Sequence, residues 1–552
     1  MPPTVDHVVV LALENRSFDH MLGFAPHSDP AFDGLLGNGP HTNPPWRGGG
    51  PPIPATPDAK PVLPVDPDHS HDAVMQQLQL KGLGSARRPT MQGFLASYEE
   101  KGRGLAPPSF EGLLGPLANW WARRQAAANP IPDRGREIMR CQPPGTVEAL
   151  TTLALQFGVC SKWFSSVPGE TWPNRNFMHA ATSDGTVDNH VGFYYDRTIF
   201  DQLEDGHRTW RIYYDDTPQV WAFRELWRPE RLANWFPFPD FARHVEQGEL
   251  PHYSFIEPNH RPPVHLPWTP GSGPEHSNNQ HPGNNLIPNA DYDTYNGPGG
   301  DFEWGEQLIA TVYETLRSNP AIFERTLLLI TYDEHGGCYD HVAPPMDARS
   351  PGDPVDRGWL RSLVDLLLRR KAKAFDFTLL GPRVPAVIVS PYVPAGAISS
   401  DPRDHASIPA TLRALFAPQA GRLTRRDEHA APFHTLARLD QPRRGADLPD
   451  LSRHLPPAPA TRTTMLAAEV VPPGPRTSGA RLLQGLRQVG RAGRQRAAHP
   501  RGRRRGRPRP RRPGQSPPGH HGVHPPRRPG QGATAIADAA ATMTMTSGAA
   551  GH

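Results

Sequence analysis

The sequence predicts an α/β protein with a doubly wound, mostly parallel sheet. Three β-prone apolar runs carry this prediction: HVVVLAL at residues 7–13, RTLLLITY at 325–332 and RVPAVIVSPYV at 383–393. The first run shows no polar alternation, which is typical of a strand buried on both faces of a parallel sheet. Helical patterns alternate with such runs along the chain, and that alternation favours a doubly wound arrangement.

The helical patterns fall into three stretches. Residues 146–164 have helical spacing and end in a short β-prone segment. GEQLIATVYETLRSN at 305–319 has the spacing of an amphipathic helix. DHASIPATLRALF at 404–416 predicts a helix with Asp or Ser near its start.

We expect one folded domain over residues 1–440, followed by a Pro/Arg-rich disordered tail over 441–552. Residues 34–68 are rich in Gly and Pro and predict a surface excursion. Residues 190–300 form a long stretch rich in aromatic and turn-forming residues. We expect inserted loops there that cover a site.

The charge of the chain is segregated. Residues 1–470 carry 43 Lys and Arg against 54 Asp and Glu, whereas residues 471–530 carry 16 Arg and no Lys or acidic residue. The folded part is therefore acidic, and the pI near 9.0 comes from the tail. A solvated extension or an out-of-frame read-through is the favoured interpretation of the tail. An arm for anionic lipid or nucleic acid is the alternative, but no aromatic residues interleave with the Arg to stack bases, so no nucleic acid is expected.

Membrane and redox signals are sparse. No stretch of 18 or more apolar residues predicts a membrane-spanning helix. Three scattered cysteines (Cys141, Cys160 and Cys338) form neither a disulfide framework nor a zinc motif. The N-terminus has no export signal, so the chain as written is expected in the cytoplasm, or outside the cell if its N-terminus is truncated.

Two of the predicted strands end in polar residues. Glu14 and Asn15 follow the first strand, and Asp333 and Glu334 follow the second. Ligands in open α/β sheets bind at the carboxyl ends of strands, so both pairs are expected to face one crevice. These oxygen donors suit a divalent cation, with Ca²⁺ or Mg²⁺ favoured by the oxygens and Zn²⁺ by nearby His. The alternative is that the acids pair with Arg16 or cap helices.

A third segment, VPGETWPNRNFMHAATSDG at 167–185, places Thr171 just before Pro173, a residue favoured in the first turn of a helix. A hydroxyl at a helix N-terminus is a natural neighbour of a phosphate oxygen. Next to a metal it would be able to attack phosphorus, with Asn174 and Arg175 binding phosphate oxygens. Thr171 as an ordinary helix-capping residue is the alternative, and the segment alone favours that alternative.

Four of the 26 histidines are candidates for proton transfer or phosphate contact. They are His69, His281, His341 and His405. No G-x-S-x-G elbow, P-loop or HExxH motif is present, so the sequence does not support a serine hydrolase, a P-loop NTPase or a zincin.

Four blocks resemble, in order, the signature blocks of the bacterial phosphoesterase family, which includes phospholipases C and acid phosphatases. The blocks are HVVVLALENRSFDHMLG, PGETWPNRNFMHAATSDG, TLLLITYDEHGGCYDHVAPP and RVPAVIVSPYV with DHASI, and the resemblance covers roughly residues 5–416. It implies an alkaline-phosphatase-like fold and a covalent phosphoenzyme at a metal.

The resemblance also implies roles for particular residues. Glu14, Asn15, Asp333 and Glu334 match metal ligands, and Thr171 matches the nucleophile. His281 and, more weakly, His69 match family His elements, and His405 matches a block that serves phosphate or the leaving group. This chain departs from the family in having no export signal and in its Arg/Pro tail.

The sequence therefore predicts a metal-dependent phosphoric ester hydrolase acting on phospholipid, with peripheral membrane contact. We favour a phospholipase C-like activity that forms a phosphothreonine, because phosphatase members tend to have Ser at the nucleophile position. An acid phosphatase acting on phosphomonoesters is the alternative, and a non-catalytic, metal-stabilised binding protein is a further one. Sulfate ester hydrolysis is disfavoured, since no C/S-x-P-x-R motif is present.

Overall fold

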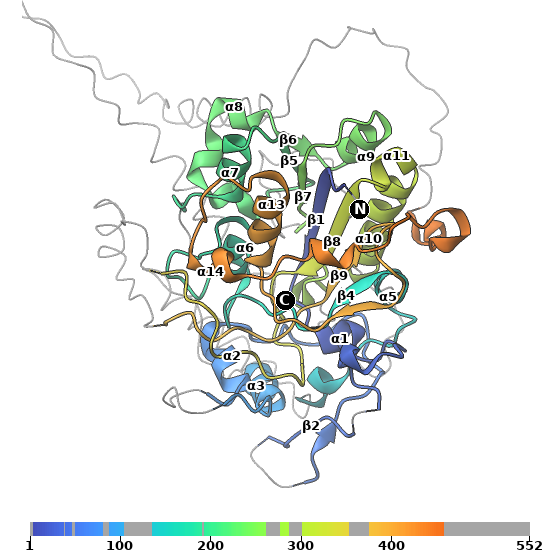
Figure 1. Cartoon of the computed structure of the whole chain (residues 1–552). Coiled ribbons are helices and arrows are strands. Elements are labelled where there is room, and N and C mark those ends of the chain that lie inside the picture. The colour runs from blue at the N-terminus through green and yellow to red at the C-terminus, as the bar shows by residue number, and fades with distance from the viewer. Residues whose placement is uncertain are drawn as a thin grey trace, which may run out of the picture.

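A mostly parallel eight-stranded sheet forms the centre of the computed structural model (Figure 1). The strand order is β10-β4-β9-β8-β1-β7-β5-β6, and β9 runs antiparallel to both of its neighbours. The structure describes residues 4–37, 39–46, 50–80, 88–103, 135–189, 193–260, 277–285, 301–352 and 375–456. Within these ranges the predicted α/β class and mostly parallel sheet are confirmed.

The strands of this sheet are short, except for the two in the middle. β1 (His7–Leu13) and β8 (Thr326–Tyr332) each span seven residues and pair in parallel along their whole length. The remaining strands are β4 (Gly158–Cys160), β5 (Trp210–Tyr214), β6 (Trp235–Pro237), β7 (Tyr253–Ile256), β9 (Ala386–Val389) and β10 (Ala397–Ser399).

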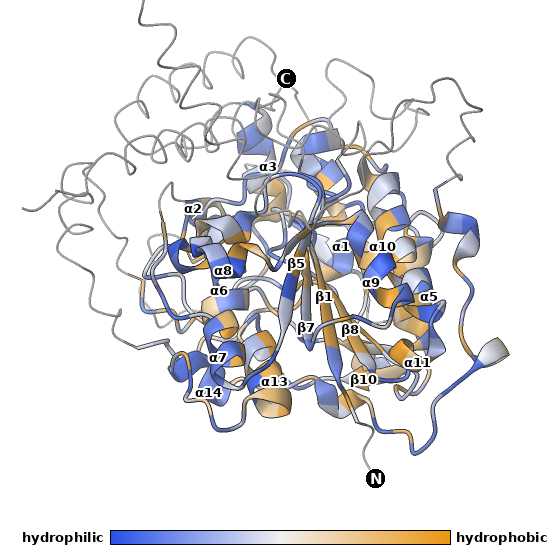
Figure 2. Ribbon diagram, turned by 90° about the horizontal axis from the view of Figure 1, so that it is seen from above, coloured by the Kyte–Doolittle hydropathy of each residue, from blue (hydrophilic) through white to orange (hydrophobic). Residues whose placement is uncertain are grey.

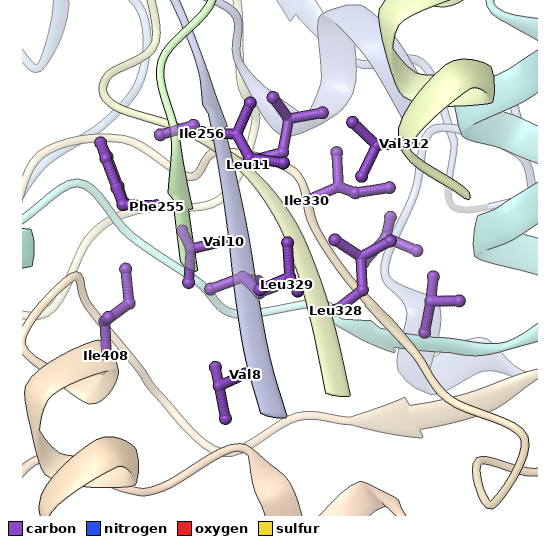
Figure 3. Close-up of a cluster of buried hydrophobic side chains, with 14 of the residues drawn as sticks. Val8, Val10, Leu11, Phe255, Ile256, Val312, Leu328, Leu329, Ile330 and Ile408 are labelled. Carbon is purple, nitrogen blue, oxygen red and sulfur yellow. The ribbon is translucent and has the colours of Figure 1, made fainter. Parts of the chain in front are cut away.

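The core surrounds β1, as the unbroken apolar run predicts. Every residue from Val8 to Leu13 has no exposed surface. Figure 3 shows Val8, Val10 and Leu11 among side chains from β7 and β8. Burial of apolar side chains on both faces of a strand requires a layer of helices on each side.

Helices cover both faces of the sheet (Figure 2). One layer contains α6 (Thr171–Ala180), α7 (Ile199–Asp205), α13 (Ser407–Phe416) and α14 (Arg425–His429). The other contains α5 (Glu148–Gln156), α9 (Pro239–Glu246), α10 (Asp301–Arg317) and α11 (Pro320–Phe323). The helices predicted within 146–164, 305–319 and 404–416 are thus α5, α10 and α13.

The N-terminal part adds a smaller lobe with its own apolar cluster, which includes Val74, Phe94 and Tyr339. Its elements are β2 (Thr42–Asn43), β3 (Ile53–Pro54), α2 (His71–Gln77) and α3 (Phe94–Gly102), whereas α1 (Phe18–Leu22) packs against the main core. The three cysteines are all free and buried. No helix among the described residues is long and apolar enough to cross a membrane.

The expectation of inserted loops over 190–300 is wrong for residues 193–260. This stretch contributes β5, β6 and β7 to the sheet, together with α7, α8 (Pro229–Leu232) and α9. The clusters of Trp, Tyr and Phe in this stretch were interpreted as parts of loops, but aromatic residues also favour β-strands. Residues 261–276 and 286–300, which belong to the same prediction, lie outside the described residues.

The packed domain also continues beyond the boundary expected at residue 440. Leu451 is buried against the main core, and the Tyr313 hydroxyl donates to the Pro449 carbonyl at 2.8 Å. Residues 441–456 therefore belong to the domain. The remainder of the predicted tail, residues 457–552, lies outside the described residues.

Candidate active site

Three parallel strands end side by side at the candidate site. Leu13 and Tyr332 are register partners at the ends of β1 and β8, so Glu14 and Asp333 leave adjacent strands at the same level. On the other side of β1, β7 ends at Ile256 and Glu257 follows it. The carboxyl ends of these strands therefore gather three buried acids along one edge of the sheet.

A single buried guanidinium holds these acids together. Arg175 of α6 donates through Nε to Asp333 Oδ2 at 3.1 Å and through Nη1 to Glu257. Its Nη2 donates to the Ala12 carbonyl at 3.0 Å and lies 3.6 Å from Glu14 Oε1. Burial opposes the charge of Arg175, but the surrounding carboxylates raise its pKa, so it stays cationic.

This placement does not match the phosphate-binding role predicted for Arg175 and Asn174. All three side-chain nitrogens of Arg175 have protein partners. The Asn174 amide is also occupied: its oxygen accepts from Val167 N at 2.9 Å, and its nitrogen donates to the Gly169 carbonyl at 3.1 Å. Arg175 therefore positions the strand-end acids, and Asn174 fixes the loop before α6.

Asn15 links the strand ends to α6. Its φ of 59° is left-handed, and its backbone amide donates to Asp333 Oδ1 at 3.0 Å. Its side-chain Oδ1 accepts a hydrogen bond from Thr171 Oγ1 at 3.3 Å, and its Nδ2 lies 2.9 Å from His281 Nε2. The structure thus brings Asn15, Thr171, Asp333 and His281 together from four separate parts of the chain.

Thr171 does not cap its helix, which was the alternative that the segment alone favoured. α6 begins at Thr171, and Glu170 occupies the N-cap position without a capping hydrogen bond from its side chain; the Trp172 amide donates to Asn189 Oδ1 at 2.8 Å. The Thr171 hydroxyl donates to Asn15 instead of accepting from an amide of the helix. Only 8% of Thr171 is exposed, so its hydroxyl lies in a largely buried position at the start of α6.

Of the four predicted metal ligands, Glu334 is the one with an oxygen available to a cation. Glu334 is fully buried; its Oε2 accepts from Gly336 N at 2.7 Å, while its Oε1 has no hydrogen-bond partner among the described residues. Burial and the adjacent Asp333 raise the pKa of Glu334 well above its usual range, and burial raises that of Asp333 to about 6. An unpartnered carboxylate oxygen beside further buried acids is a place where a divalent cation would lower the free energy of the charged forms.

His281 and His69 lie beside this cluster, with ring centroids 5.5 Å apart. Burial lowers the pKa of His281. For His69, burial also favours the neutral ring, but the carboxylates of Glu334 and Asp66 raise the pKa to about 9. The two predicted imidazoles therefore have different proton affinities next to Asn15 and Glu334.

His405 lies behind the site. Its Nε2 is 2.5 Å from the Asp333 carbonyl oxygen, and its Nδ1 accepts from the Trp163 indole at 3.2 Å. Burial lowers its pKa to about 4, so the ring is neutral and Nε2 donates to the carbonyl. Both ring nitrogens are engaged by protein groups, so the structure places His405 as a support for the turn at Asp333 and not as a group that faces substrate.

His341 belongs to a second cluster, with Asp19 and Asp340. His341 Nδ1 lies 2.6 Å from Asp19, and the three side chains place ligand atoms within 4.8 Å of one another. However, the buried Arg383 donates to Asp19 at 2.8 Å and to Asp340 at 2.9 Å. Burial opposes protonation of His341, but Asp19 raises its pKa to about 9. All four carboxylate oxygens of Asp19 and Asp340 accept hydrogen bonds, whereas Glu334 at the strand ends keeps an oxygen that is unpartnered among the described residues, so this cluster is the poorer metal site.

Sequence reasoning missed two residues after β7. Glu257 pairs with Arg175, and His260 Nε2 lies 3.2 Å from Glu14 Oε1 while its Nδ1 lies 3.2 Å from Asp216. Burial would raise the pKa of Glu14, but His260 and Arg175 lower it to about 2. The sequence signal that could have found them is the one used for the other two strands: the apolar end of a strand, SFI at 254–256, is followed directly by polar residues, EPNH at 257–260.

Arg16, whose role the sequence leaves open, is also fully buried. Its Nε donates to the Gln280 carbonyl at 2.8 Å, and its guanidinium lies 5.3 Å from the centre of the Phe302 ring. Its two terminal nitrogens have no hydrogen-bond partner among the described residues. Arg16 therefore does not pair with Glu14 or Asp333 in the described part of the chain, contrary to the alternative in which it neutralises them.

Comparison with known proteins gives a consistent result. Residues 5–417 match the model of the Phosphoesterase family. The non-specific phospholipase C3 of Arabidopsis thaliana is 30% identical over 466 residues, which cover 81% of this chain and 76% of that protein. The non-specific phospholipase C6 of the same plant is 32% identical over 451 residues, covering 79% and 73% of the two chains.

Among solved structures, a protein in the alkaline phosphatase superfamily from Vibrio parahaemolyticus matches 50% of this chain and 65% of its own, with 11% identity and a TM-score of 0.28. The family match covers all four blocks quoted from the sequence. The chain therefore belongs to the Phosphoesterase family and is a phosphoric ester hydrolase.

Proposed function

We propose that the protein is a phospholipase C-like enzyme that hydrolyses phosphatidylcholine to diacylglycerol and phosphocholine through a phosphothreonine on Thr171. The observation that carries the proposal is the hydrogen bond of 3.3 Å from the Thr171 hydroxyl to Asn15, at the shared carboxyl ends of β1 and β8. Two relatives named non-specific phospholipase C, similar over more than three quarters of this chain, support a phospholipid substrate.

In this proposal Glu14, Asn15, Asp333 and Glu334 hold a divalent cation, Ca²⁺, Mg²⁺ or Zn²⁺. When bound, it favours deprotonation of a neighbouring hydroxyl and offsets charge on the phosphoryl oxygens. Asn15 orients the Thr171 oxygen, and Arg175 keeps the strand-end carboxylates in place.

The chemistry has two displacements at phosphorus. Thr171 Oγ1 gives its proton to the His69–His281 pair and forms a bond to phosphorus, while the bond between phosphorus and the diacylglycerol oxygen breaks. That oxygen takes a proton from the His69–His281 pair and leaves as the alcohol. Water then attacks phosphorus and gives a proton to the pair, while the bond between phosphorus and Thr171 Oγ1 breaks and phosphocholine is released. Thr171 Oγ1 takes a proton back from the pair, which restores its hydroxyl.

Product analysis tests the substrate. Purified protein is incubated with divalent metal and phosphatidylcholine, and phosphocholine and inorganic phosphate are measured separately. Phosphocholine with diacylglycerol is the expected result. Hydrolysis of phosphomonoesters alone would support the acid phosphatase instead, and no hydrolysis of any phosphoric ester would support the binding protein.

Two substitutions test the nucleophile. Thr171→Ala is expected to lower kcat by a factor of 10³ or more, because the attacking oxygen is gone. Thr171→Ser keeps that oxygen and is the matched control, expected to retain measurable activity. Mass spectrometry after acid quenching should find a phosphoryl group on Thr171 of the unmodified chain, and full activity of Thr171→Ala would exclude this mechanism.

A further inference from the structure

Two short segments that pair with each other carry a group of aromatic side chains and one arginine. We call this group the aromatic patch; it consists of Phe193, Tyr195, Trp221, Arg224 and Trp227. Tyr194 N donates to the Ala222 carbonyl at 2.9 Å, and Arg224 N donates to the Tyr194 carbonyl at 3.0 Å. Tyr194 is buried in the core, while Phe193 is half-buried and Tyr195 is exposed. Alternation along extended backbone explains this difference, since neighbouring side chains point to opposite faces.

Three rings of the patch pack on one another. Phe193 lies edge-on to Trp227 with centroids 5.5 Å apart, and Trp221 lies 4.9 Å from Trp227. The Trp227 indole donates to the Trp221 carbonyl at 2.8 Å. Among the large hydrophobic side chains that the structure describes, Tyr195 is the most exposed, at 60%. Tyr195 lies two residues from Phe193 on the extended segment, so its exposed ring is on the same face as Phe193 and extends the patch toward solvent.

The patch also carries a positive charge. The exposed Arg224 guanidinium lies 5.7 Å from the centre of the Trp227 ring, and no carboxylate within the described ranges forms an ion pair with it. The neighbouring Arg197 and Arg228 differ in this respect, because they pair with Asp205 and Glu225. Of these three arginines, Arg224 is therefore the one that can pair with an anion from outside the protein.

The patch is connected to the candidate active site. Val220, the residue before Trp221, donates its amide to Glu257 Oε1 at 3.3 Å. Gln219 Nε2 donates to Asn176 Oδ1 of α6 at 3.1 Å. The short helix Gln219–Ala222 thus rests on the helix that begins with Thr171. Figure 1 shows α6, α7 and α8, between which the patch segments run in sequence, on the same side of the sheet.

We propose that the aromatic patch docks the enzyme on the surface of a phosphatidylcholine bilayer. Aromatic rings favour the boundary between headgroups and acyl chains, and their faces attract quaternary ammonium groups such as choline. An arginine at the same surface binds the lipid phosphate. The charges of the patch therefore complement a zwitterionic headgroup. The proposal rests on the proposed function, which places the substrate in a membrane.

Vesicle binding tests the docking independently of turnover. The full chain carrying Thr171→Ala is sedimented with sucrose-loaded phosphatidylcholine vesicles, so that the lipid stays intact. Adding Tyr195→Ala is expected to lower the partition coefficient about tenfold, the typical effect of losing one buried ring. Arg224→Ala is expected to lower it several-fold. Tyr195→Phe retains the ring and should bind nearly as well as the parent. Leu36→Ala, which removes another exposed apolar side chain (51% exposed), should have no effect.

A second measurement uses chains with Thr171 intact. The rate on vesicular phosphatidylcholine is divided by the rate on a short-chain phosphatidylcholine below its critical micelle concentration. Tyr195→Ala should lower this ratio about tenfold with an unchanged rate on the monomeric lipid. If the parent chain hydrolyses neither lipid, the proposed function fails, but sedimentation still decides the docking. Unchanged partitioning of Tyr195→Ala and Arg224→Ala, equal losses in Leu36→Ala, or no partitioning of the parent would overturn the docking surface.

Discussion

The backbone amide of Asn15 donates a hydrogen bond to the Asp333 carboxylate at 3.0 Å, across a sequence separation of 318 residues. The contact exists because β1 and β8 end at the same level and Asn15 takes a left-handed conformation that turns its amide toward the neighbouring strand. It fixes the distance between the two polar pairs that the sequence singles out. The chemistry of the site depends on this register, and the predictions below test it.

Metal binding should depend on the strand-end acids and not on the second cluster. Glu334→Gln removes the charge of a buried carboxyl with an unpartnered oxygen, and is expected to abolish stoichiometric metal in the purified protein. His341→Gln is the matched control, since the carboxylate oxygens of its cluster all have hydrogen-bond partners, and it should retain the metal. Elemental analysis of both folded variants measures the outcome. Loss of metal in His341→Gln alone would assign the ion to the second cluster.

The close approach of Gly336 to Asn15 should make this glycine irreplaceable. Gly336 has φ of +64°, and a Cβ there would lie 1.9 Å from the Asn15 carbonyl oxygen. Gly248 has φ of +71° but open space around it, so Gly248→Ala measures the conformational cost alone, about 1 kcal/mol. Gly336→Ala should destabilise by at least about 2 kcal/mol more, because the Asn15 turn must move. Urea unfolding compares the two variants, and equal losses would mean that the turn adjusts freely.

Arg175 should be essential for stability as well as for the arrangement of the acids. Arg175→Met leaves Asp333 and Glu257 without their buried partner and should lower the free energy of unfolding by about 3–5 kcal/mol. Arg317→Met breaks a partly exposed pair with Glu314 and should cost less than about 1 kcal/mol. Denaturant unfolding in the absence of metal provides the comparison. A similar cost for both variants would argue against the structural role of Arg175.

Glu306 should make stability depend on pH. This buried side chain accepts from Ala149 N at 2.8 Å, and burial raises its pKa from 4.5 to about 7. The folded state therefore binds the proton more tightly than the unfolded chain. The resulting stabilisation is complete below pH 4.5 and is lost as the pH rises through about 7, a change of about 3 kcal/mol.

Glu306→Gln removes this titration while keeping an oxygen for the amides of α5. Relative to the parent, the variant should become more stable as the pH rises from 4.5 to 7, by up to about 3 kcal/mol. Urea unfolding at a series of pH values gives both profiles. Parallel profiles would show that Glu306 titrates alike in the folded and unfolded chains.

Much of the architecture could be predicted because its signals are local. The unbroken apolar runs at 7–13 and 325–332 predict buried parallel strands, and the structure confirms both. The helical periodicities at 305–319 and 404–416 correspond to α10 and α13. The strands β5 and β6 were missed, because five or three residues rich in aromatics do not reveal a period and resemble loops.

The sequence by itself determined the α/β class, the central strands, the polar pairs that follow them and the position of Thr171 before Pro173. These features follow from short-range patterns of residue type. Only the tertiary structure decided which of them meet. It placed Arg175 under the acids, His405 behind Asp333 and His341 in a separate cluster, and it added Glu257 and His260. The physical reason is that strand order and register, which no local pattern encodes, set the distances between side chains far apart in the chain.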